Sequence, residues 1–168
     1  MAIRRIVGAI LGLCVFFSWN AVSAEEDPAY LVIGAGASDF RIKFDAAEFD
    51  LAYRSDHALW ILKPQAGILA TSGGAVYGWG GVLADVELAS HWVLTPSVAA
   101  GAFGNGKDEK LGDILEFRSG VDLAYRYDDH SRLGLGFYHV SNAGAGVSNP
   151  GEQTLMINYS VPMNWIAP

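Results

Sequence analysis

The sequence predicts an eight-stranded antiparallel transmembrane β-barrel of the bacterial outer membrane. Three observations predict it: an export leader at the N-terminus, apolar–polar alternation in segments of roughly ten residues, and no long apolar run after the leader. About half of the residues are apolar (51%). Nevertheless, no segment after Ala24 approaches the roughly 18 consecutive apolar residues that a membrane-spanning helix needs. Alternating strands are typical of a barrel, in which lipid-facing and lumen-facing side chains follow one another.

The N-terminal segment has the three parts of a secretory signal peptide. Two arginines near the start form a positive region, and the run from Ile6 to Trp19 is largely apolar. Val22-Ser23-Ala24 then resembles an A-x-A cleavage site. We therefore expect residues 1–24 to be removed and residues 25–168 to form a single barrel domain.

Cysteine content and charge exclude several classes of site and partner. The single cysteine, Cys14, lies in the leader, so we expect neither a disulfide framework nor a thiolate metal site in the mature chain. Removal of Arg4 and Arg5 takes the formal net charge from -7 to -9. An acidic domain is a poor match for nucleic acid, which we exclude as a partner.

The clearest strand runs from about residue 114 to 127. Its odd positions are mainly apolar or aromatic, whereas its even positions carry Glu116, Arg118, Asp122 and Arg126. In a small membrane barrel the apolar row faces lipid and the charges fill the lumen as a structural network. A soluble sandwich has the same alternation with the faces reversed. The leader, the missing cysteines and the tyrosines at the strand ends favour the barrel.

The same alternation predicts the other strands and their connections. We expect strands at about 30–39, 45–55, 58–71, 75–89, 91–104, 112–127, 131–142 and 153–163. Tight turns are expected at 55–57, 90 and 128–130 on the periplasmic side, and longer loops at 39–44, 104–112 and 143–151 outside. His57, His91 and His130 are expected to be surface residues, because no second histidine stands at a metal-ligand spacing from any of them.

Strand 131–142 departs from the pattern near its end. Its outward row begins with apolar residues, including Leu135 and Phe137, and then continues with His139 and Ser141. Polar groups on a lipid face are costly and tend to be functional. A neutral imidazole can activate a serine hydroxyl as a nucleophile, and a third group such as Glu152, in the following loop, can orient the imidazole.

The alternative is a polar cap where the row reaches the lipid headgroups, and spacing alone does not separate the two interpretations. The strand runs outward, which places the His-x-Ser pair near the outer leaflet, where lipopolysaccharide is found. That position favours the functional interpretation.

The segment Phe-Tyr-His-Val-Ser-Asn-Ala-Gly at 137–144, followed by Asn-Pro-Gly-Glu at 149–152, resembles the lipid A 3-O-deacylase family (PagL-like acyloxyacyl hydrolases). The specific similarity covers only this region near the C-terminus. The resemblance implies an eight-stranded barrel that hydrolyses the ester-linked acyl chain at the 3-position of lipid A, with no metal and no cofactor.

The resemblance also implies a role for each matching residue. Ser141 corresponds to the nucleophile, His139 to the general base and Glu152 to the acid that orients the histidine. Asn142 and the backbone amide near Gly144 correspond to the groups that hold the oxyanion.

The sequence thus predicts an outer-membrane serine esterase acting on lipid A of lipopolysaccharide. Acyl chains would lie against Leu135 and Phe137, outer-membrane lipid would surround the barrel, and the protein would be a monomer or homodimer. A non-catalytic structural or lipid-binding barrel is the competing class. A narrow porin is disfavoured because eight strands leave too little lumen for a channel, and a soluble secreted β-sandwich is the remaining alternative.

Overall fold

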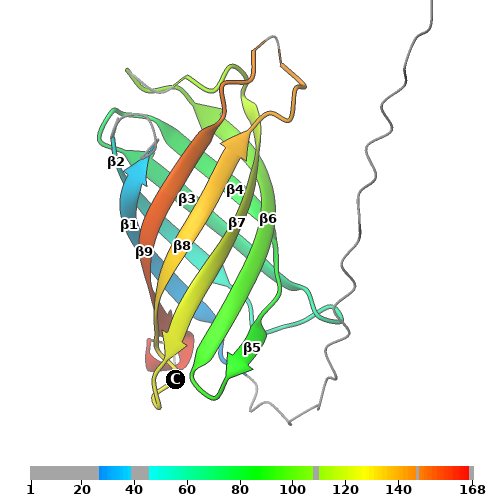
Figure 1. The fold of residues 1–168 in the computed structure, drawn as a ribbon, viewed down its shortest axis with the longest axis vertical. Helices are drawn as coiled ribbons and strands as arrows, with labels where there is room; N and C mark the ends of the chain where they lie inside the picture. The colour runs from blue at the N-terminus through cyan, green and yellow to red at the C-terminus, as the bar shows by residue number, and fades with distance from the viewer. Residues whose placement is uncertain (1–26, 39–45, 108–109, 147, 167–168) are drawn as a thin grey trace, which may run out of the picture.

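The computed structural model describes residues 27–38, 46–107, 110–146 and 148–166, so the expected leader lies outside them. The described chain is built almost entirely of β-strands that lie side by side around one axis (Figure 1). The strands are β1 (Tyr30–Ser38), β2 (Ala47–Arg54), β3 (Lys63–Thr71), β4 (Val76–Leu83), β5 (Val86–Ala89), β6 (Trp92–Gly104), β7 (Leu115–Arg126), β8 (Arg132–Ser141) and β9 (Glu152–Pro162). A short 3-10 helix, Met163–Trp165, follows β9. No helix among the described residues is long and apolar enough to cross a membrane.

The sheet closes on itself because β4 pairs with β6. The order β4-β3-β2-β1-β9-β8-β7-β6 is antiparallel throughout, and the β4–β6 pairing joins its two ends. The register against β6 continues unchanged from β4 into β5. Between them Ala84 donates its N–H to the Pro96 carbonyl at 3.1 Å, but Pro96 has no N–H to donate in return. β4 and β5 are therefore one strand interrupted opposite a proline, and the predicted eight-stranded barrel is confirmed.

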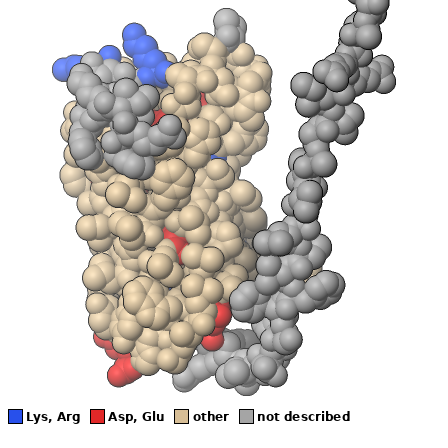
Figure 2. Space-filling model, in the orientation of Figure 1, with Lys and Arg blue, Asp and Glu red and all other residues tan. Residues whose placement is uncertain are grey.

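The two faces of the strands have opposite polarity. Large apolar side chains on the outer face are exposed, whereas most buried polar and charged side chains point into the lumen. The outward set includes Ile33, Phe49, Leu51, Ile68, Val98, Leu123, Leu135 and Ile157. Figure 2 shows that one side of the barrel is mostly uncharged between its two ends. This surface suits lipid rather than water.

The lumen is filled by paired charges, as predicted for this strand pattern. Arg54 contacts Asp122 at 2.9 Å, and Arg118 contacts Asp50 at 3.1 Å. The Arg118 guanidinium also lies 3.7 Å from the ring centroid of Tyr138. These side chains are nearly inaccessible to solvent. The interior is therefore a packed polar core rather than an open channel.

Glu116 and Arg126, the other two charges expected in the lumen, occupy different levels of the barrel. Glu116 is fully buried. Arg126 lies at the end of β7, where its guanidinium contacts Asp27 at 3.2 Å and Glu87 at 2.7 Å. Arg126 thus joins the N-terminal segment to the rim of the barrel.

The expected strand from residue 58 is wrong over residues 58–62, because β3 begins at Lys63. Leu59 and Leu62 instead exchange two backbone hydrogen bonds, at 2.8 and 3.2 Å, and Trp60 adopts a left-handed backbone with φ 65°. The β2–β3 connection therefore spans residues 55–62 and is longer than the expected tight turn at 55–57.

The ends of the barrel differ in their connections. The 55–62 connection, the turns after β5 and β7 and both ends of the described chain lie at one end, which is the lower end in Figure 1. The loops after β6 and β8 lie at the other end, together with the short turn after β3. With the chain termini in the periplasm, the His139–Ser141 end of β8 faces the cell exterior.

Candidate active site

The outward row of β8 changes from apolar to polar as it approaches the exterior. Leu133, Leu135 and Phe137 are 44%, 52% and 40% exposed and face lipid. His139 and Ser141 continue the same row and are half-buried. The predicted orientation of β8 is therefore confirmed, with both polar residues on the lipid side.

Register brings two more polar side chains to the same place. His139 lies opposite Ser119 of β7 on one side and opposite Gln153 of β9 on the other. Ser119 is exposed and Gln153 is half-buried. Ser119, His139, Ser141 and Gln153 form what we call the outer polar patch. Sequence reasoning missed Ser119 and Gln153, because only the strand register reveals that they flank the histidine.

The loop after β8 starts with a tight turn that directs the chain back over this patch. Ala145 donates its N–H to the Asn142 carbonyl at 2.9 Å. The two central residues, Ala143 and Gly144, have φ 53° and 80°. Two successive positive φ values are the signature of a type I′ turn, which glycine adopts without strain.

Asn142 anchors the loop from the inside. Its side chain is fully buried. The Asn142 Nδ2 donates to the carbonyls of Leu111 at 3.3 Å and Ser148 at 2.7 Å, and the Gly144 N–H donates to Asn142 Oδ1 at 3.0 Å. Asn142 therefore links the β6–β7 and β8–β9 loops. In this conformation the two groups expected to hold the oxyanion bind the protein itself, so their oxyanion role stays a prediction.

Gly151 closes the loop directly above the His-x-Ser pair. A Cβ placed on it would lie 3.0 Å from His139 Cε1 and 3.7 Å from Ser141 Cβ, and its φ is +64°. Both side chains thus lie within 3.7 Å of one point. Only glycine provides this backbone conformation and this close approach without displacing the imidazole.

The neighbour of the His139 ring is an amide. Gln153 Nε2 lies 3.2 Å from His139 Nδ1. Glu152 is paired with Val140 rather than with His139. Because successive residues of a strand point to opposite faces, the Glu152 side chain lies on the buried, lumen-facing side, where it is 7% exposed. The orienting role expected for Glu152 stays a prediction.

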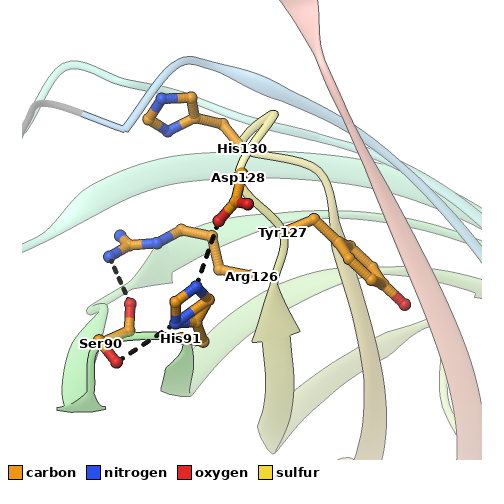
Figure 3. Close-up of a pocket in the computed structure, with 6 residues that line it drawn as sticks. All are labelled: Ser90, His91, Arg126, Tyr127, Asp128 and His130. Atoms are coloured by element: carbon orange, nitrogen blue, oxygen red, sulfur yellow. Dashed lines mark hydrogen bonds and ion pairs between the residues drawn. The ribbon is translucent and has the colours of Figure 1, made fainter.

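A shallow pocket lies at the other end of the barrel. Figure 3 shows His91 beside Ser90 and Asp128, with Arg126 and His130 nearby. His91 Nδ1 lies 3.2 Å from Ser90 Oγ, and its Nε2 lies 3.3 Å from Asp128 Oδ1. Among the described residues no group of three or more His, Cys, Asp or Glu side chains is arranged to hold a metal ion.

Comparison with known sequences identifies the family. The sequence model of the lipid A 3-O-deacylase (PagL) family matches residues 38–162. The chain belongs to the PagL family. It is accordingly an outer-membrane β-barrel, and the predicted resemblance is confirmed. No curated protein sequence matches the chain.

Solved structures support the same fold. The crystal structure of the outer membrane enzyme PagL superposes with a TM-score of 0.62 at 18% identity, covering 79% of this chain and 99% of that one. A de novo designed transmembrane β-barrel superposes with a TM-score of 0.53 at 13% identity, covering 82% of this chain and 98% of the design. At such identities the similarity concerns the backbone fold.

Proposed function

We propose that this protein removes the ester-linked 3-position acyl chain from lipid A, with Ser141 as nucleophile and His139 as general base. The observation that carries the proposal is the outer polar patch, which interrupts an otherwise apolar outer face at the exterior end of β8. Polar side chains facing lipid are costly, so their presence calls for a functional reason. Membership of the PagL family supplies the substrate class.

The chemistry follows ordinary serine ester hydrolysis. The Ser141 hydroxyl oxygen attacks the ester carbonyl carbon while His139 Nε2 takes the hydroxyl proton. Collapse of the tetrahedral intermediate breaks the bond to the sugar oxygen, which leaves with the proton from His139. A water molecule then repeats the sequence on the acyl-enzyme, releases the fatty acid and restores Ser141. No step requires a metal or a cofactor.

The histidine needs the right tautomer for this role. Because Nε2 must be unprotonated, Nδ1 carries the hydrogen and requires an acceptor. Rotating the Gln153 amide by half a turn exchanges its nitrogen for its oxygen, which can then accept the Nδ1 hydrogen at the observed 3.2 Å. Glu152, the acid implied by the family resemblance, reaches Nδ1 only if its side chain leaves the lumen side. We therefore propose that either Gln153 or Glu152 orients the imidazole, and a mutational comparison of the two must decide between them.

The substrate reaches the site from the membrane rather than from the lumen. Phe137 and Leu135 lie directly below His139 on the same outward row and are well exposed. An acyl chain lying along this row would bring its ester linkage to the level of Ser141. Since the lumen is filled by side chains, lateral entry is the direct route.

Mass spectrometry of lipid A from cells that express the wild-type chain or Ser141→Ala tests the proposal. We expect the wild type to remove one 3-position acyl chain and Ser141→Ala to leave lipid A intact. Ser90→Ala is the matched control, because it removes the same hydroxyl from the turn at the opposite end of the barrel. Intact lipid A with a folded wild-type barrel would favour the non-catalytic alternative.

A further inference from the structure

The connection between β2 and β3 carries four consecutive exposed apolar side chains. Leu59 is 78% exposed and Trp60 is 89% exposed, followed by Ile61 and Leu62 at 43% and 40%. Most of the other exposed large apolar residues belong to the barrel wall. Here they sit at the tip of a hairpin that Figure 1 shows extending sideways from the lower end of the barrel. We call residues 58–62 the lateral hairpin.

Two residues of the lateral hairpin pair their backbone groups within the protein. Leu59 and Leu62 satisfy each other's N–H and carbonyl groups at 2.8 and 3.2 Å. In lipid every backbone polar group must find such a partner within the protein. Polar side chains lie at the base of the hairpin, where the His57 N–H donates to Ser55 Oγ at 3.0 Å and His57 Nδ1 lies 2.8 Å from Asp56 Oδ1.

Trp60, at the tip of the hairpin, carries a free-energy cost in its backbone conformation and in the exposure of its side chain to water. Trp60 has φ 65°, a backbone conformation that is a genuine outlier for a bulky side chain. A strained residue persists where its surroundings favour it. In the described structure Trp60 is the most exposed of the large apolar residues. The Leu59–Leu62 pair closes the turn that holds Trp60 in this conformation, and the exposed Trp60 side chain is available for a contact beyond the described residues.

We infer that the lateral hairpin inserts into the periplasmic leaflet of the outer membrane and binds phospholipid acyl chains there. It lies at the end of the barrel that carries Trp92 and Tyr125, whose rings pack edge to face at 5.5 Å. Exposed Tyr53 ends the outward row of β2 just before the connection. Aromatic side chains gather at the membrane–water interface. The lateral hairpin thus extends the interfacial aromatic belt beyond the barrel wall, as an anchor that fixes the depth and tilt of the barrel.

Site-directed spin labelling tests this inference, because the mature chain is expected to contain no cysteine. Nitroxide labels at Leu59→Cys and Trp60→Cys, in the mature barrel reconstituted in phospholipid bilayers, report accessibility to oxygen and to a water-soluble nickel chelate. Ile68→Cys on the lipid face of β3 is the lipid control. Asp128→Cys in the β7–β8 turn is the aqueous control, since that carboxylate side chain is 99% exposed.

We expect both hairpin labels to give an oxygen-to-nickel accessibility ratio close to that of Ile68→Cys and several-fold above that of Asp128→Cys. A ratio matching Asp128→Cys in a folded barrel would overturn the inference. Dipolar broadening between labelled copies, lost on dilution with unlabelled protein, would also overturn it and assign the hairpin to a second copy of the chain. Because neither readout uses lipid A, the result is independent of the proposed esterase activity.

Discussion

His139 and Gln153 are direct cross-strand partners on the lipid-facing side of the barrel, and Gln153 Nε2 lies 3.2 Å from His139 Nδ1. In the mechanism proposed above, this contact holds the ring on its Nδ1 side while Nε2 acts on Ser141. An orienting group at Gln153 would lie at the lipid–protein boundary, whereas one at Glu152 would come from the lumen side. The following predictions test this arrangement and the barrel that supports it.

Gln153→Ala should lower kcat by about tenfold, because one hydrogen bond worth about 1.4 kcal/mol no longer holds the imidazole. Gln153→Glu should restore activity, since a carboxylate accepts the same Nδ1 hydrogen. Glu152→Ala is the matched comparison on the lumen side. Steady-state hydrolysis of lipid A in mixed micelles measures all three variants. A large loss in Glu152→Ala with none in Gln153→Ala would assign the orienting role to Glu152 instead.

Gly151→Ala should reduce kcat by a larger factor than it reduces the fraction of folded barrel. The added methyl group meets His139 Cε1 at 3.0 Å, and φ +64° strains any residue with a Cβ. The imidazole must move, which should disturb the proposed proton transfer from Ser141 to Nε2. Gly74→Ala is the control, because its φ is +89° but nothing lies within 4 Å of the added methyl group. Equal activity loss in the two variants would show that backbone strain alone is responsible.

Phe137→Ala should raise KM for lipid A with little change in kcat. Phe137 offers an apolar surface for the acyl chain below the reacting groups and takes no part in the proposed bond-making and bond-breaking steps. The loss of a well-exposed aromatic contact corresponds to about tenfold in KM, or about 1.4 kcal/mol. Phe49→Ala makes the same change on β2, three strands away on the lipid face. If both variants raise KM equally, the effect arises from general lipid contact and not from a substrate position on β8.

Asp122→Ala should destabilise the barrel by about 3–5 kcal/mol, the usual cost of leaving a buried charge without its partner. Asp122 accepts hydrogen bonds from Arg54 at 2.9 Å and from Tyr138 at 2.7 Å, and it also contacts Asn158. Urea unfolding of the barrel in detergent micelles measures the change. Glu87→Ala at the rim, which breaks the 2.7 Å contact with Arg126, should cost about 1 kcal/mol or less. Comparable decreases in the free energy of unfolding of the two variants would contradict the view that the lumen network holds the barrel together.

Period-2 alternation predicted the strands, their number and the row that His139 and Ser141 share, because it depends only on which residues alternate along each strand. The choice of a membrane barrel over a soluble sandwich needed the export leader, the missing cysteines and the tyrosines at the strand ends as well. The lateral hairpin was not predicted, because residues 58–62 form a continuous apolar run that reads as strand until Leu59 and Leu62 are seen to pair with each other. The break at Ala84 depends on Pro96 of the neighbouring strand, a long-range pairing that a local pattern does not contain.

The same distinction between local pattern and long-range pairing applies to the residues of the candidate site. A local motif identifies the His-x-Ser pair, whereas the neighbours of His139 depend on register. Gln153 lies beside the ring and Glu152 points to the opposite face because β8 and β9 pair His139 with Gln153. A shift of one residue in that pairing would exchange the two. Sequence spacing alone therefore could not choose between them.

The central claim is that Ser141 cleaves the 3-position ester from the lipid side, and its most direct test uses purified barrel in bilayers that contain lipid A. Released fatty acid and 3-O-deacylated lipid A are quantified together for the wild type, Ser141→Ala and the control Ser90→Ala. We predict equimolar products from the wild type and from Ser90→Ala, and none above background from Ser141→Ala. Undiminished release by a folded Ser141→Ala barrel would contradict the claim and move the nucleophile elsewhere.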